Sequence, residues 1–179
     1  MTAGIADAVY IDVMVFVYFL LSPRYYGISQ KSRAFFKDIQ DGKYVGKVST
    51  FSVMEYVGVA KAIISEQRKK EITHKETLAV KDTILQFIRD MGIELYDADE
   101  LVVQQDMAKC SLFSESESLL ENATPMLGRN DGKWHSLKGA DSLHLVFALR
   151  TNAEYFATFD DDFRGVKNTV RTLMINEEY

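Results

Sequence analysis

The sequence predicts an α/β fold in which helices cover both faces of a parallel sheet. Short apolar segments typical of buried strands alternate along the chain with longer segments of helical periodicity. Acidic residues follow several of these strands directly, at the positions where helices begin. The chain has 179 residues and only 2 prolines, which favours one domain over residues 1–179 without a long linker.

The first part of the chain alternates between predicted strands and helices. Apolar, β-branched and aromatic runs predict strands at 8–11, 44–49 and 93–96. Apolar residues at helical spacing predict helices at 13–21, 31–40, 51–70, 75–91 and 100–111. Pro23, Gly42 and Gly92 mark the ends of three of these helices.

The stretch 139–163 predicts a helix followed by a strand. Asp141 lies in the opening turn of the helix, and Leu143, His144 and Phe147 lie on one of its faces. Residues 155–159 form an apolar, aromatic strand that is followed by three aspartates at 160–162. A short turn then precedes a last strand at 170–175. Between 114 and 138 the periodicity is weak, and 128–132 has the composition of a turn.

Charge and cysteine content limit the function classes. The net charge of -5 gives no general basic field that would predict nucleic-acid binding. Cys110 is the only cysteine, which excludes a disulfide framework or a thiolate metal site and favours a reducing, cytoplasmic setting. The apolar run at 8–21 contains Asp12 and is shorter than the ~20 residues of a membrane-spanning helix, so we expect it to belong to the core.

Four acidic residues occupy corresponding junctions between strands and helices. Asp12 ends the first strand, and Glu55 lies one turn into the helix after the second strand. Asp141 opens the late helix, and Asp160 follows the strand after it. Because chemistry gathers at the carboxyl edge of such a sheet, all four can converge there. Four like charges need a cation, and Mg²⁺ or Mn²⁺ takes such oxygen ligands.

Each candidate also has a purely structural interpretation. Ser52 and Glu55 match a capping box, and Asp141 can complement a helix dipole. Asp12 can cap the helix that follows it, and Asp160 can cap the short turn at 161–163. His144 either orients a carboxylate or packs as an ordinary helix histidine. It is the set of four acids that favours a metal site.

Four motifs together resemble the PIN-domain nucleases, a family that includes the toxin subunits of VapBC-type toxin–antitoxin pairs. They are Val-Tyr-Ile-Asp at 9–12, Ser-Thr-Phe-Ser-Val-Met-Glu at 49–55, Gly-Ala-Asp-Ser-Leu-His at 139–144 and Ala-Thr-Phe-Asp-Asp-Asp-Phe at 157–163. The similarity spans nearly the whole chain and keeps the order and approximate spacing of the motifs. The chain is longer than compact toxin members, and the excess forms an insertion around 111–138.

The resemblance implies a three-layer α/β/α sandwich with a central parallel sheet, and a Mg²⁺- or Mn²⁺-dependent ribonuclease. By motif position, the catalytic and metal-binding acids are Asp12, Glu55, Asp141 and Asp160, with Asp162 as a further metal ligand and Thr158, Ser52 and His144 in support. Implied partners are an RNA substrate, a small antitoxin protein whose segment fills the acidic cleft, and a second copy in a homodimer. Many members have a polar residue two after the first Asp, where this chain has Met14.

The expected activity is hydrolysis of RNA phosphodiesters by metal-activated water, which leaves a 5′-phosphate and a 3′-hydroxyl. One alternative is a PIN-like module of RNA binding or processing with weak catalysis, which Met14 and the acidic net charge favour. Another is phosphoryl transfer through an aspartyl phosphate at Asp12. That chemistry needs a second acid at the position of Met14, so it is the weaker alternative.

Overall fold

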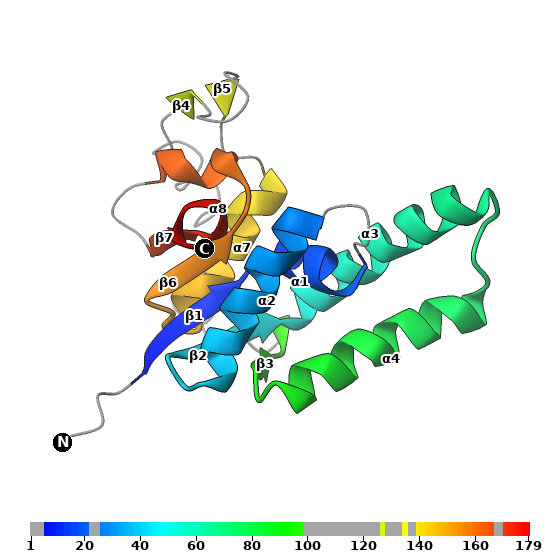
Figure 1. Cartoon of the computed structure of the whole chain (residues 1–179), viewed down its shortest axis with the longest axis horizontal. Helices are drawn as coiled ribbons and strands as arrows, with labels where there is room; N and C mark the ends of the chain where they lie inside the picture. The colour runs from blue at the N-terminus through cyan, green and yellow to red at the C-terminus, as the bar shows by residue number, and fades with distance from the viewer. Residues whose placement is uncertain (1–5, 22–25, 99–125, 128–133, 136–138, 167–169) are drawn as a thin grey trace, which may run out of the picture.

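Five parallel strands form the central sheet, in the order β3-β2-β1-β6-β7 (Figure 1). The computed structural model describes residues 6–21, 26–98, 126–127, 134–135, 139–166 and 170–179. The strands of the sheet are β1 (Asp7–Ile11), β2 (Tyr44–Ser49), β3 (Glu94–Tyr96), β6 (Tyr155–Thr158) and β7 (Arg171–Met174). Central β1 pairs in parallel with β2 on one side and with β6 on the other.

Helices lie on both faces of this sheet. They are α1 (Val13–Leu20), α2 (Tyr26–Gln40), α3 (Thr50–Arg68), α4 (His74–Asp90), α7 (Gly139–Arg150), the 3-10 helix η1 (Asp161–Gly165) and α8 (Ile175–Glu178). Predicted and observed elements agree within one or two residues except at α2, which begins five residues before the predicted start at 31. The predicted helix at 100–111 and the turn at 128–132 lie outside the described residues.

From the region of the expected insertion, the structure describes only β4 (Met126–Leu127) and β5 (Trp134–His135), which pair antiparallel. No helix among the described residues is both long enough and apolar enough to span a membrane.

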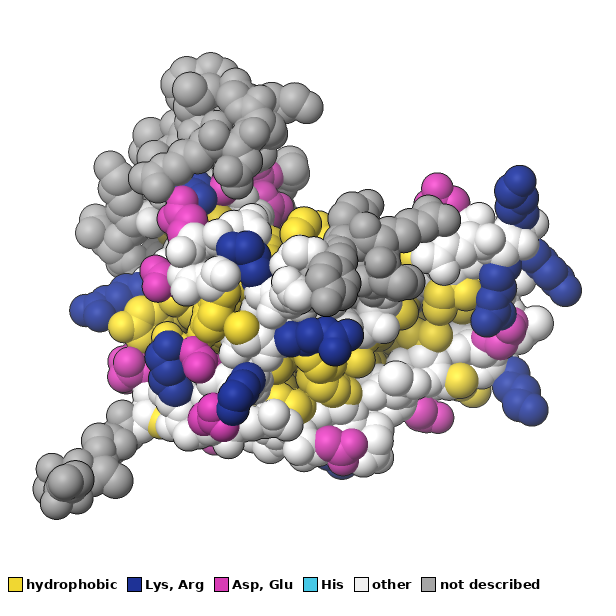
Figure 2. Space-filling model, in the orientation of Figure 1, with side chains coloured by type: hydrophobic (Ala, Val, Ile, Leu, Met, Phe, Trp, Pro, Cys, Tyr) yellow, Lys and Arg dark blue, Asp and Glu magenta, His cyan; other side chains and the backbone are white. Residues whose placement is uncertain are grey.

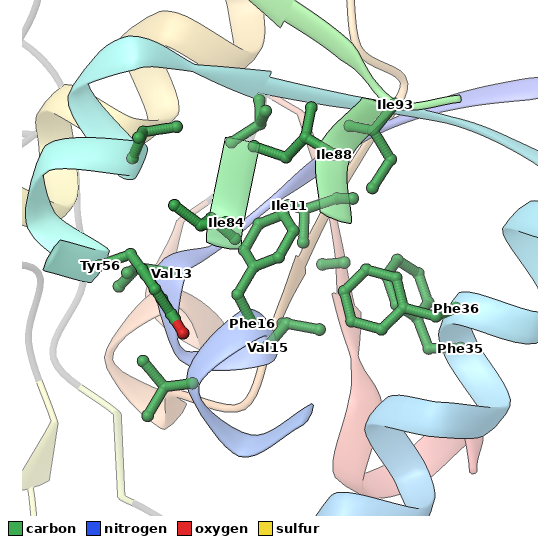
Figure 3. Packing of buried hydrophobic residues seen from close by; sticks show 14 of the residues in the cluster. Ile11, Val13, Val15, Phe16, Phe35, Phe36, Tyr56, Ile84, Ile88 and Ile93 are labelled. Atoms are coloured by element: carbon green, nitrogen blue, oxygen red, sulfur yellow. The ribbon is translucent and has the colours of Figure 1, made fainter. Parts of the chain in front are cut away.

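The core has two parts because alternate residues of β1 point to opposite faces of the sheet. Val9 and Ile11 belong to the larger cluster, which packs the sheet against α1 to α4 (Figure 3). Tyr10 belongs to the smaller cluster on the other face, with residues of α7 and Phe156. The sheet is therefore covered on both sides, as the alternation of apolar segments predicted.

Helices α3 and α4 form an antiparallel pair that extends away from the sheet (Figure 1). Thr73 and Glu76 form a capping box at the start of α4. Arg68 pairs with Glu76 across the connection, and Figure 2 shows Lys and Arg side chains around this free end. At the other end of α3, the start of the helix lies beside the carboxyl ends of the strands.

Candidate active site

Asp12 comes directly after β1 and is almost fully enclosed, with 4% of its surface exposed. Its backbone N–H donates to the carbonyl of Ala157 at 3.0 Å, which fixes it beside the end of β6. The hydroxyl of Thr158, the last residue of β6, donates to Asp12 Oδ2 at 2.7 Å. The two neighbouring strand ends thus hold this carboxylate in one position. Met14 packs partly buried against the core, so polar support for Asp12 comes from Thr158 instead.

Asp160 is joined to Asp12 through Thr158. The backbone N–H of Asp160 donates to Thr158 Oγ1 at 3.0 Å, so that one hydroxyl contacts both positions. Asp160 Oδ1 accepts from the backbone N–H of Asp162 at 2.8 Å and caps η1. The structural interpretation of Asp160 as a cap is therefore confirmed. Asp162 itself is buried, with 6% of its surface exposed.

Glu55 approaches from α3 and contacts a histidine from α7. Glu55 Oε2 lies 2.5 Å from Nε2 of His144, whose side chain is 3% exposed while that of Glu55 is 33% exposed. The alternative of a capping box between Ser52 and Glu55 is wrong. Strand β2 runs to Ser49, which becomes the N-cap of α3 and accepts from the backbone N–H of Ser52.

A chain of buried hydroxyl groups continues from the histidine into the sheet. Nδ1 of His144 lies 3.3 Å from Ser52 Oγ. Ser52 Oγ lies 3.0 Å from the hydroxyl of Tyr10, which in turn lies 2.7 Å from Ser49 Oγ. The sequence reasoning selected Ser52 and His144 but missed Tyr10 and Ser49. Tyr10 stands in a run of apolar strand residues, where a buried hydroxyl needs a partner, and that was the available signal.

The charges of the site act on one another. Burial raises the pKa of Asp12 to about 6; the imidazole of His144 and the Thr158 hydrogen bond oppose this rise, and the charge of Glu55 adds to it. Burial alone would lower the pKa of His144, but the hydrogen bond to Glu55 and the charges of Asp12, Glu55 and Asp141 outweigh it. The pKa of His144 is therefore raised above its usual value. Asp12, Glu55 and Asp141 therefore share one electrostatic environment, since the charges of all three act on His144.

The donor chemistry of this environment fits a divalent cation. Asp12 and Glu55 offer carboxylate oxygens, Asp12 is a buried acid whose ionised form a cation would favour, and the partly exposed Glu55 leaves access from solvent. Within the described part of the chain, no three or more His, Cys, Asp or Glu side chains are already grouped to hold a metal ion. The Glu55 carboxylate is held by His144 instead.

Comparison with solved structures gives matches over nearly the whole chain. A chain from the crystal structure of VapBC2 from Rickettsia felis bound to a DNA fragment from their promoter matches with a TM-score of 0.56 and 14% identity, covering 93% of this chain and 97% of that chain. Mycobacterium tuberculosis VapC20, described as a Sarcin-Ricin loop cleaving toxin, matches with a TM-score of 0.48 and 11% identity, over 90% of this chain and 98% of the other.

No protein-family model matches the sequence, and no curated protein sequence does. At 14% identity, the match to the VapBC2 structure establishes the fold. It confirms the predicted α/β/α sandwich with its five-stranded parallel sheet, which is the fold that the resemblance to PIN domains implied.

Proposed function

We propose that this chain is a divalent-metal-dependent endoribonuclease that acts as the toxin of a toxin–antitoxin pair. The observation that supports this most is the buried carboxylate of Asp12 at the carboxyl edge of the sheet. It shares an electrostatic environment with Glu55 and Asp141, in a fold similar to that of a VapBC2 chain. A bound cation favours the ionised form of a buried carboxylate, which burial alone disfavours.

In this proposal, Asp12, Glu55, Asp141 and Asp160 hold Mg²⁺ or Mn²⁺, with Asp162 as a further ligand. When bound, the cation lowers the pKa of a water molecule and neutralises charge on the phosphate. Thr158 keeps the Asp12 carboxylate in place through its hydrogen bond to Oδ2. The exposed side of Glu55 is where the phosphodiester of a single RNA strand approaches.

The experiment that tests this proposal compares wild-type protein with Asp12→Asn on RNA in the presence of Mn²⁺. We expect the wild type to leave 5′-phosphate and 3′-hydroxyl ends and the variant to lose at least ~100-fold in rate. Asp82→Asn is the matched control, because Asp82 is an exposed acid on α4, away from the strand ends. Equal cleavage by wild type and Asp12→Asn would refute the proposal.

We propose that the chain folds as one domain. The proposed partners are a small antitoxin protein and a second copy of the chain. An antitoxin that reaches the acidic site needs a cationic side chain, and an Arg pairs best with two carboxylates. The gene order supplies a direct check, since we expect a short reading frame for such a protein beside this one. The alternative of a catalytically weak RNA-binding module predicts metal binding without turnover of any RNA.

A further inference from the structure

We propose that the free end of the α3–α4 hairpin binds the phosphate backbone of the RNA substrate. The inference rests on the proposed function, because that function supplies the RNA. It assigns the contact to five exposed lysines within residues 61–81, which we call the lysine end. They are Lys61, Lys69, Lys70, Lys75 and Lys81.

The first argument is that these lysines are unpaired. Among the described residues, no hydrogen bond or ion pair involves the ammonium group of any of the five. The other described Lys and Arg side chains each interact with a partner. Lys37, for example, pairs with Asp41, and Lys43 with Asp38, both at 2.7 Å. The lysine end can therefore meet an anion without first breaking a contact.

The second argument is that the backbone of the lysine end is held in place. Between the two helices, the N–H of Lys70 donates to the carbonyl of Ser65 at 3.1 Å, and the N–H of Ile72 donates to Ser65 Oγ at 3.3 Å. The side chain of Ile72 is buried, and the capping box of Thr73 and Glu76 starts the next helix. Because the connection is already folded, binding an anion there orders little besides the lysine side chains.

The third argument is the separation of charge along the chain. Residues 61–81 contain six Lys or Arg and three Glu, a net charge of +3 with neutral histidine, whereas the whole chain carries -5. The rest of the chain therefore carries -8. RNA carries a negative charge at every phosphate, so the lysine end attracts it while the rest of the chain on balance repels it.

The kind of cation favours phosphate over carboxylate as the partner. Arg matches the two oxygens of a carboxylate with its planar fork, but Arg68, the one Arg in this segment, is already paired with Glu76 at 2.6 Å. The remaining cations are lysines, which act as point charges and bind phosphate groups in many orientations. A nucleic-acid backbone therefore fits the lysine end better than an acidic peptide does.

The lysine end also lies at a suitable distance from the candidate active site. Helix α3 carries Glu55 in its second turn and Lys69 at its C-cap, so ~21 Å of helix separates them at 1.5 Å per residue. At ~3.4 Å per stacked nucleotide, this distance corresponds to ~6 nucleotides. We therefore expect the lysine end to strengthen the binding of RNA longer than this, without taking part in the chemical step.

The first experiment measures RNA binding without cleavage. Full-length protein in EDTA is titrated into a fluorescent single-stranded RNA of ~15 nucleotides, and fluorescence anisotropy gives the affinity between ~50 and ~200 mM salt. For Lys70→Gln/Lys75→Gln we expect a loss of at least ~10-fold at ~50 mM salt. We also expect a salt slope smaller by ~1.4, since each phosphate contact of a single strand contributes ~0.7.

The matched control is Lys37→Gln/Lys43→Gln, which changes the net charge equally at exposed positions outside the hairpin. We expect it to lose less than ~3-fold in affinity, because only the general field of the protein changes. Equal losses in the two double variants, or a wild type that does not bind the RNA, overturn the inference.

Competition distinguishes RNA from other anionic partners. Unlabelled RNA should displace the labelled strand from wild-type protein at a concentration at least ~10-fold lower than polyglutamate of equal charge. Vesicles that contain phosphatidylserine should not bind the protein. Polyglutamate that competes as well as RNA, or vesicles that bind wild type but not Lys70→Gln/Lys75→Gln, would assign the surface to an acidic protein or a membrane and overturn the inference.

Cleavage kinetics in Mn²⁺ separate the inference from the proposed function. For Lys70→Gln/Lys75→Gln we expect KM for the long RNA to rise at least ~10-fold with kcat nearly unchanged, and kcat/KM for RNA of ~4 nucleotides to stay the same. An unchanged affinity and KM in an active nuclease contradict the role of the lysine end alone. RNA that binds through the lysine end but is never cleaved contradicts the nuclease and supports the binding surface.

Discussion

The hydroxyl of Thr158 donates a hydrogen bond of 2.7 Å to the buried carboxylate of Asp12, across the ends of two adjacent parallel strands. The same oxygen accepts from the backbone N–H of Asp160. A single hydroxyl therefore fixes the acid that ends β1 relative to the turn that follows β6. Asp12 needs this donor because burial disfavours its ionised form.

Replacing Thr158 by Val tests this relationship, because the change removes the hydroxyl and keeps the shape. Hydrogen bonds to charged groups contribute ~1.5–3 kcal/mol, so we expect the free energy of unfolding to fall by ~2 kcal/mol near neutral pH. The pKa of Asp12 should also rise further, since one of the contacts that lower it is gone. Urea denaturation measures the first effect. Thr158→Ser keeps the hydroxyl and should retain most of the stability; equal losses in the two variants would contradict this role.

Asp12→Asn should stabilise the protein near neutral pH while it removes the proposed RNA cleavage. The pKa of Asp12 is raised from 3.8 to about 6, so the folded state binds a proton more readily than the unfolded state does. The wild type therefore loses stability as the pH rises from about 4 to about 6, and Asn at this position does not. The shift corresponds to at most ~3 kcal/mol.

Urea denaturation of wild type and Asp12→Asn at several pH values measures this difference. We expect the two proteins to be similar near pH 4 and the variant to be more stable above about pH 6, in line with the sign of the linkage. A difference in unfolding free energy that stays constant across this pH range would show that burial does not disfavour the ionised form of Asp12.

Glu55→Gln should lower the pKa of His144. The hydrogen bond to Glu55 and the negative charges of Glu55, Asp12 and Asp141 raise the pKa of this imidazole by more than burial lowers it. Gln at position 55 removes the largest of the contributions that raise the pKa of His144, so the lowering of this pKa by burial is opposed less strongly. NMR titration of the histidine ring signals measures the change, with the exposed His74 as an internal reference. An unchanged pKa would mean that Glu55 does not hold the ring.

Gly46→Ala should destabilise the fold, because side chains of the core fill the space beside Gly46 in β2. A Cβ atom there would lie 3.0 Å from Ile93 Cγ1 and 3.2 Å from Ile11 Cδ1. Overpacking of this kind costs ~1–3 kcal/mol. Gly58→Ala is the matched control, since a Cβ at this exposed position of α3 meets nothing within 4 Å. It should add ~0.5–1 kcal/mol, because Gly is a poor helix former. Thermal unfolding that moves in the same direction for both variants would contradict the packing argument.

The strands and most helix boundaries could be predicted because they follow from apolar periodicity, which is local. Helix α2 begins at Tyr26, earlier than predicted. The prediction missed its first turn because that turn contains Gly27 and Ser29 and lacks a regular apolar pattern. The alternative of a capping box between Ser52 and Glu55 was wrong because two serines, Ser49 and Ser52, both suit an N-cap. The length of β2 decides between them, and that length depends on pairing with β1.

The candidate site was only partly predictable for a similar reason. The acids follow strands in the sequence, so their junctions could be identified without a structure. The contacts of His144 could not, because Ser52 and Glu55 are 92 and 89 residues away in the chain. Which nitrogen faces which partner depends on how α7 packs against the sheet beside α3. The metal-binding role of the four acids stays a prediction, and the experiments above test it.

The order of the strands has a consequence for synthesis of the protein on the ribosome. β1 is made before its two neighbours, and the second of them, β6, follows only after β2 and β3, so that Asp12 and Thr158 are 146 residues apart. A nascent chain that stops before β6 leaves Asp12 beside β2 alone, without the hydroxyl that fixes it. The acidic centre therefore assembles only after β6 has been synthesised.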